Sequence, residues 1–116
     1  MPIIYLSPST QEGNFYVNGG TEEEWMNRLA DAMVPYLRAS GIQYVRNTPN
    51  MTAADSIRAS NAGNYDLHLA LHSNAAPEAI YGQVRGIIVF YYPSSIEGRR
   101  ASVLLARNLR AIFPLP

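Results

Sequence analysis

Short apolar runs alternate with longer helical repeats along the chain, and this alternation predicts an α/β fold. The runs at residues 3–6, 42–46 and 67–71 have the length and composition of buried strands. The segment 86–92, Gly-Ile-Ile-Val-Phe-Tyr-Tyr, has the strongest strand pattern and predicts a fourth strand. Because no helical repeat separates the third and fourth strands, we expect the fourth to be antiparallel.

Three segments carry the start and stop signals of helices, at residues 21–41, 52–63 and 94–114. Each begins with Thr or Ser three positions before an acidic residue, which is the spacing of an N-terminal cap. Glycine closes the first two segments and proline closes the third. The order β-α-β-α-β-β-α therefore predicts an α/β fold with an open, mostly parallel (mixed) sheet and helices on both faces.

Composition and charge narrow the classes of function. The chain has 116 residues, which predicts one domain over 1–116, and it is 47% hydrophobic. Nine basic residues balance nine acidic ones, so there is no excess positive charge to attract nucleic acid or an anionic membrane. The absence of cysteine excludes disulfides and thiol chemistry. Residues 1–8 lack the basic segment and the apolar length of a secretory signal.

Candidate chemistry gathers where the strands are expected to end. Ligands of open α/β sheets bind at the carboxyl ends of the strands, which selects the loop 7–20, residues 46–48 and residues 72–75. An acid of the run 22–24 could meet His72 there, and imidazole with carboxylate suits Zn²⁺. The same acids also suit the positive end of a helix dipole, which is the more ordinary explanation for them.

His68 precedes His72 by four positions on the same face of its strand. At about 3.3 Å per residue the two positions are roughly 13 Å apart, so we do not expect both imidazoles on one metal. We therefore interpret His68 as a hydrogen-bonded residue of the core or of the surroundings of the site.

Several short stretches resemble one enzyme family. They are Ile4-Tyr5-Leu6-Ser7-Pro8, the Glu23/Asn27 pair, Asn61-Ala62, Asp66-Leu67 and Leu71-His72-Ser73-Asn74-Ala75. Together they resemble the zinc-dependent N-acetylmuramoyl-L-alanine amidases of the Amidase_3 type. The resemblance implies an amidase-like α/β sheet and a hydrolase that cleaves the amide between N-acetylmuramic acid and L-alanine in peptidoglycan. It also implies one zinc ion and action at the cell wall.

The resemblance also assigns roles to single residues. Glu23 and His72 match two of the family's three zinc ligands. Thr10 stands where the family has its first histidine, and Gln11 or Glu12 could replace that ligand from the same loop. The family's catalytic glutamate belongs to a later strand and loop, for which these 116 residues offer no candidate.

Asn74, two positions after His72, is suited either to hydrogen-bonding the substrate or to supporting a zinc ligand. We further expect the domain to be truncated at its carboxyl end, with a sheet edge left open for pairing with a second copy. Two other functions remain open: a non-catalytic remnant that binds cell-wall glycopeptide, and an unrelated doubly wound binding domain. Zinc content and amide cleavage would distinguish the hydrolase from the remnant.

Overall fold

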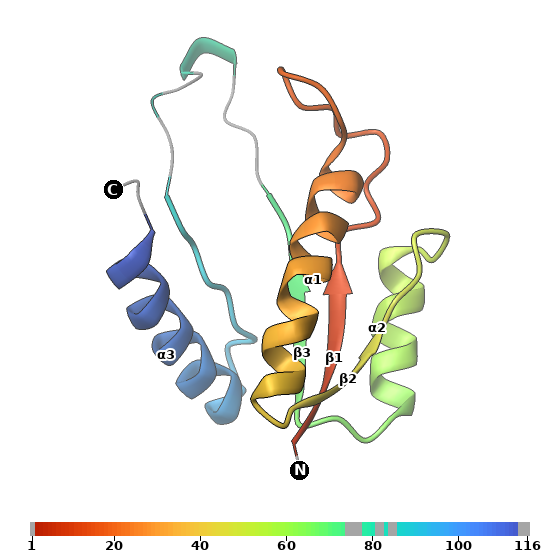
Figure 1. The fold of residues 1–116 in the computed structure, drawn as a ribbon, viewed down its shortest axis with the longest axis vertical. Helices are drawn as coiled ribbons and strands as arrows, with labels where there is room; N and C mark the ends of the chain where they lie inside the picture. The colour runs from red at the N-terminus through yellow and green to blue at the C-terminus, as the bar shows by residue number, and fades with distance from the viewer. Residues whose placement is uncertain (1, 74–77, 81–82, 84–85, 114–116) are drawn as a thin grey trace. The chain divides into compact units, whose positions relative to one another are not determined.

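The chain divides into two compact units, Met1–Asn74 and Ala75–Pro116. A computed structural model describes residues 2–73, 78–80, 83 and 86–113 (Figure 1). The first unit contains five elements: β1 (Ile3–Pro8), α1 (Glu22–Ala39), β2 (Gln43–Arg46), α2 (Ala53–Ala62) and β3 (Leu67–Leu71). The second unit contains a 3-10 turn, η1 (Glu78–Ile80), and α3 (Ile96–Ile112). The expectation of a single domain stays a prediction.

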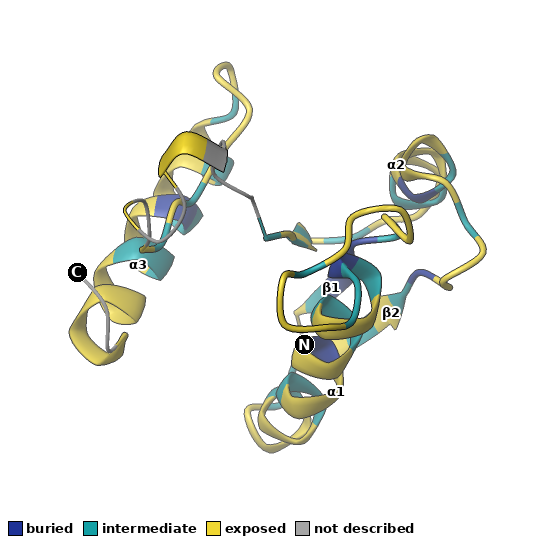
Figure 2. Cartoon of the chain, turned by 90° about the horizontal axis from the view of Figure 1, so that it is seen from above, coloured by how far each residue is buried: buried dark blue, intermediate teal, exposed yellow. Residues whose placement is uncertain are grey.

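The first unit is built on a three-stranded parallel sheet in the order β2-β1-β3. Ile4 of β1 lies opposite Tyr44 of β2 and Leu67 of β3. The helices α1 and α2 cover opposite faces of this sheet (Figure 2). This placement follows from right-handed crossovers, because the connection through α1 runs to one side of β1 and the connection through α2 returns to the other. The open parallel sheet predicted from the sequence is thus confirmed.

The central strand supplies most of the core. Among the described residues the buried hydrophobic side chains are Ile4, Tyr5 and Leu6 of β1 and Ala30 of α1. A strand paired on both edges and covered on both faces is shielded from water in every direction, which explains why an apolar run was required there. None of the helices in the described part of the chain is both long and apolar enough to cross a membrane.

The predicted fourth strand at residues 86–92 is wrong. These residues have no strand pairing, and Ile88, Phe90 and Tyr92 are mostly exposed. The segment was predicted as a strand because β-branched and aromatic side chains pack well on a half-buried pleated sheet. Such packing requires a neighbouring strand, and none pairs with this segment among the described residues. The sheet seen in the structure is therefore parallel throughout, without the antiparallel strand expected for a mixed sheet.

The helix caps agree with the sequence except in α3. Thr21 caps α1, and Thr52 forms both bonds of a capping box with Asp55 at the start of α2. In α3 the capping side chain is Ser95, which accepts from the Gly98 N–H, and the prediction of Ser94 is one position early. The spacing of three between Ser94 and Glu97 favoured Ser94, but the adjacent Ser95 has equal capping ability and is the cap that forms.

Candidate functional site

The site lies where β1 and β3 end side by side. The parallel register runs up to Pro8 opposite Leu71, and the Ser9 N–H then donates to the Leu71 carbonyl over 2.9 Å. This pairing sets Ser9 beside the residue that follows β3, His72. The loop after β1 returns to the same edge, because the Glu22 N–H donates to the Asn14 carbonyl over 2.8 Å at the start of α1.

Glu22 is the carboxylate at this edge, and it is almost fully buried, with 4% of its surface exposed. Its Oε2 lies 3.5 Å from Nδ1 of His72 and accepts a hydrogen bond from the Ser9 hydroxyl. Its Oε1 accepts from the Ser73 N–H over 3.3 Å. The His72 side chain is 52% exposed, so one of the two facing groups is buried and the other is open to a ligand.

Glu23, the expected zinc ligand, is hydrogen-bonded to Asn27 and is not the acid that faces His72. Asn27 donates to the Glu23 carbonyl over 2.7 Å and to its Oε1 over 3.2 Å. Glu24 pairs with Arg28 over 2.8 Å on the exposed side of the helix. Successive residues of a helix are about 100° apart around its axis, so only one of three consecutive acids can face the strand ends. The structure brings Glu22 to His72, one position before Glu23.

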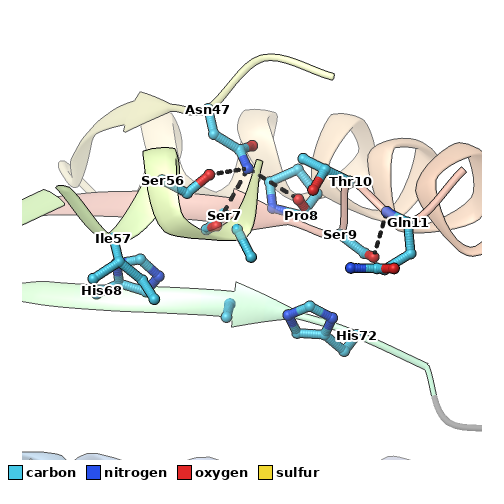
Figure 3. A pocket seen from close by; sticks show the side chains of 12 residues that line it. Ser7, Pro8, Ser9, Thr10, Gln11, Asn47, Ser56, Ile57, His68 and His72 are labelled. Carbon is cyan, nitrogen blue, oxygen red and sulfur yellow. Dashed lines mark hydrogen bonds between the residues drawn. The ribbon is translucent and has the colours of Figure 1, made fainter. Parts of the chain in front are cut away.

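Among the described residues, the hydrogen bonds of the Glu22 carboxylate go to Ser9, His72 and Ser73, and none goes to the loop residues expected to complete the ligand set. Thr10 and Gln11 line a cavity of about 130 Å³ that also reaches His72 (Figure 3). Glu12 is exposed on the same loop. The loop side chain that contacts the carboxylate is Ser9, whose hydroxyl also accepts from the Gln11 N–H over 3.2 Å. Asn74, expected to bind substrate, lies outside the described residues.

A buried amide closes the inner end of this cavity. The Asn47 Nδ2 donates to the Pro8 carbonyl over 3.1 Å and to the Ser56 hydroxyl over 3.0 Å, and lies 3.3 Å from the Ser7 hydroxyl (Figure 3). These bonds join β1, the end of β2 and α2 in one network. The network therefore ties together three elements that line the cavity.

His68 lies in the cavity wall but is exposed, so the prediction that it belongs to the core is wrong. Its ring stacks on Tyr5 with centroids 5.3 Å apart, and it lines the cavity four residues before His72. Burial lowers the pKa of His68 below its ordinary value, because desolvation disfavours the charged imidazolium. The His68 ring thus forms part of the cavity wall, where it stacks on Tyr5.

The donors at this edge fit a zinc ion in part. Carboxylate oxygen and imidazole nitrogen are ligands that zinc binds, and both are present on Glu22 and His72. Two ligands at about 2.0–2.1 Å from a tetrahedral zinc stand roughly 3.3 Å apart. The observed 3.5 Å matches this separation better than a charge-assisted hydrogen bond of about 2.7–2.9 Å. No group of three His, Cys, Asp or Glu that could hold a metal occurs among the described residues.

Two residues of the site, Ser9 and Tyr16, were not foreseen from the sequence, and Glu22 was foreseen only as one acid of the run 22–24. Glu22 was obscured by its two acidic neighbours, and Ser9 by the alignment of Thr10 with the family histidine. Tyr16, whose hydroxyl is hydrogen-bonded to the Ser73 hydroxyl, had no signal beyond its place in a long loop after the first strand. Comparison of the chain with family models, curated proteins and solved structures gave no match.

Proposed function

We propose that the first unit is a zinc-dependent amide hydrolase domain acting on peptidoglycan, at the bond between N-acetylmuramic acid and L-alanine. The observation that carries the proposal is the buried Glu22 carboxylate facing His72 at the carboxyl edge of a parallel sheet. The substrate class comes from the resemblance of the chain to the amidase family, which is most specific over residues 66–75. Asn74 is proposed from the same resemblance to hydrogen-bond the substrate.

Glu22 and His72 would hold the metal. A bound zinc ion supplies a water of lowered pKa and polarises the carbonyl of the amide that is cleaved. The remaining residues orient the ligands: Ser9 and Ser73 fix the two oxygens of Glu22, and the buried position of that carboxylate keeps water from competing for them.

Zinc affinity tests the ligand pair, and the two adjacent glutamates provide a matched comparison. We expect Glu22→Gln and His72→Ala each to weaken zinc binding by about tenfold or more, because each removes one of two protein donors. Glu23→Gln should leave the affinity within twofold of wild type. Competition with a fluorescent chelator measures the zinc affinity of the wild type and the three variants. Equal loss in Glu22→Gln and Glu23→Gln, or no zinc uptake by the wild type, would contradict the assignment.

Cleavage tests the reaction. N-Acetylmuramoyl-L-alanyl peptide should release a free L-alanine amino terminus in the presence of zinc, and this release should be lost in His72→Ala. Amine labelling followed by chromatography measures the product. The matched control is Glu23→Gln, which keeps the acidic helix start while leaving the pair at the strand ends intact.

A second candidate is a non-catalytic domain that binds cell-wall glycopeptide. The lack of a three-ligand cluster in the described part of the chain favours it. It predicts that the same glycopeptide binds the protein with or without zinc and is recovered uncleaved. Calorimetric titration with and without a chelator distinguishes the two functions.

A further inference from the structure

The loop between β1 and α1 folds into a small hairpin at residues 15–21. Phe15 and Thr21 form an antiparallel bridge, and the Tyr16 N–H donates to the Gly20 carbonyl over 2.9 Å. Gly20 has a φ of +82°, and a Cβ there would lie 2.5 Å from the indole nitrogen of Trp25. Glycine at this position therefore permits both the turn and the close approach of the indole.

Trp25 fastens the hairpin to the first turns of α1. Its indole N–H donates to the Gly19 carbonyl over 3.0 Å, and its ring is nearly parallel to that of Tyr16 with centroids 6.2 Å apart. The Arg28 guanidinium lies 4.7 Å from the centroid of the Trp25 ring. These contacts hold the Tyr16 ring in one orientation, and they come from the same helix that carries Glu22.

The Tyr16 hydroxyl then crosses to the end of β3. It is hydrogen-bonded to the Ser73 hydroxyl, and the Ser73 N–H donates to Oε1 of Glu22 over 3.3 Å. Ser73 directly follows His72, so one tyrosine connects the helix that carries the carboxylate with the strand end that carries the imidazole. We propose that Tyr16 is a positioning residue that keeps Glu22 and His72 at their mutual distance. This inference rests on the proposed metal site.

Tyr16→Phe tests this role, because it keeps the ring against Trp25 and removes only the hydroxyl. We expect zinc to bind about fivefold more weakly, as for the loss of one ordinary hydrogen bond. The Ser73 amide, whose bond to Glu22 depends on this geometry, should exchange its hydrogen about fivefold faster in metal-free protein. Tyr36→Phe, on an exposed tyrosine of α1, is the matched control and should change neither quantity.

Ser73→Ala removes the other hydroxyl of the same hydrogen bond. It shows whether the effect of Tyr16→Phe comes from the loss of this bond. Combined with Tyr16→Phe it should weaken zinc binding no further than either change alone, because both remove one interaction. Fluorescence of Trp25, the only tryptophan, checks in every variant that the hairpin is still packed.

Zinc affinity and Ser73 amide exchange together test the metal site and the role of Tyr16 separately. Zinc binding by the wild type with unchanged affinity in Tyr16→Phe would overturn the role of Tyr16 and leave the metal site standing. Failure of the wild type to bind zinc would overturn the metal site, while faster Ser73 exchange in Tyr16→Phe would still support Tyr16 as the residue that orders the Glu22 contact. Unchanged exchange in that case would overturn both.

Discussion

At the scale of residues, the site depends on which of three consecutive glutamates at the start of α1 faces His72. The spacing of Glu23 and Asn27 suggested Glu23 as the ligand, and the structure uses that spacing for a bond between these two side chains. Glu22 is the acid that faces His72. Sequence alone could place an acid of the run 22–24 at the edge where His72 ends a strand. It could not select the acid, because that depends on the angle at which the helix meets the sheet.

The two histidines of the chain differ in environment, and this predicts a pH effect on stability. Burial lowers the pKa of His68 in the folded state below its ordinary value of 6.5. As the pH falls below about 6.5, the unfolded chain takes up a proton that the folded chain resists, so the free energy of unfolding decreases down to the folded pKa. His68→Gln should lose this part of the pH dependence.

Urea unfolding at several pH values from about one unit above to about one and a half units below the ordinary histidine pKa measures the effect. His72→Gln is the matched control, since it removes the only other histidine and leaves His68 in place. The comparison uses the slope of stability against pH, because the stacking of His68 on Tyr5 also contributes to stability at every pH. Equal slopes in wild type and His68→Gln would contradict the prediction.

At the scale of elements, the sequence predicted those whose signals are local. The helices α1 and α2 follow from their caps and repeats, and β1 and β3 follow from apolar runs bounded by turn residues. The segment 86–92 failed because a strand also needs a partner, which no local pattern encodes. The parallel direction of β1, β2 and β3 agrees with expectation, because helices that alternate with strands act as crossover connections between parallel strands. The order β2-β1-β3 was not predicted.

The cap of α3 yields a prediction from two neighbouring serines. Ser95 accepts from the Gly98 N–H in the structure, whereas the sequence favoured Ser94. Ser95→Ala should destabilise the start of α3 by about 1 kcal/mol, the usual effect of losing an N-cap. Ser94→Ala should have little effect. Hydrogen exchange at the amides of residues 97–99 measures the local stability in both variants, and faster exchange in Ser94→Ala alone would restore the cap predicted from the sequence.

At the scale of the whole molecule, the thin core of the first unit sets its stability. Leu6 of the central strand is fully buried, and only three other hydrophobic residues among those described are buried with it. Domains with small cores are marginally stable, so each buried side chain carries a large share of the total. Leu6→Ala removes buried methyl groups and leaves a cavity beside the central strand, at an expected cost of about 3 kcal/mol.

Val45→Ala on the edge strand β2 is the matched control, because Val45 is 42% exposed and has less contact to lose. Urea unfolding followed by far-ultraviolet circular dichroism compares the two with wild type. We expect Leu6→Ala to lower the unfolding midpoint several times more than Val45→Ala does. Similar shifts would mean that the central strand is not the main source of stability. Because β1 also leads into Ser9 beside Glu22, Leu6→Ala should weaken zinc binding as well wherever the folded population falls.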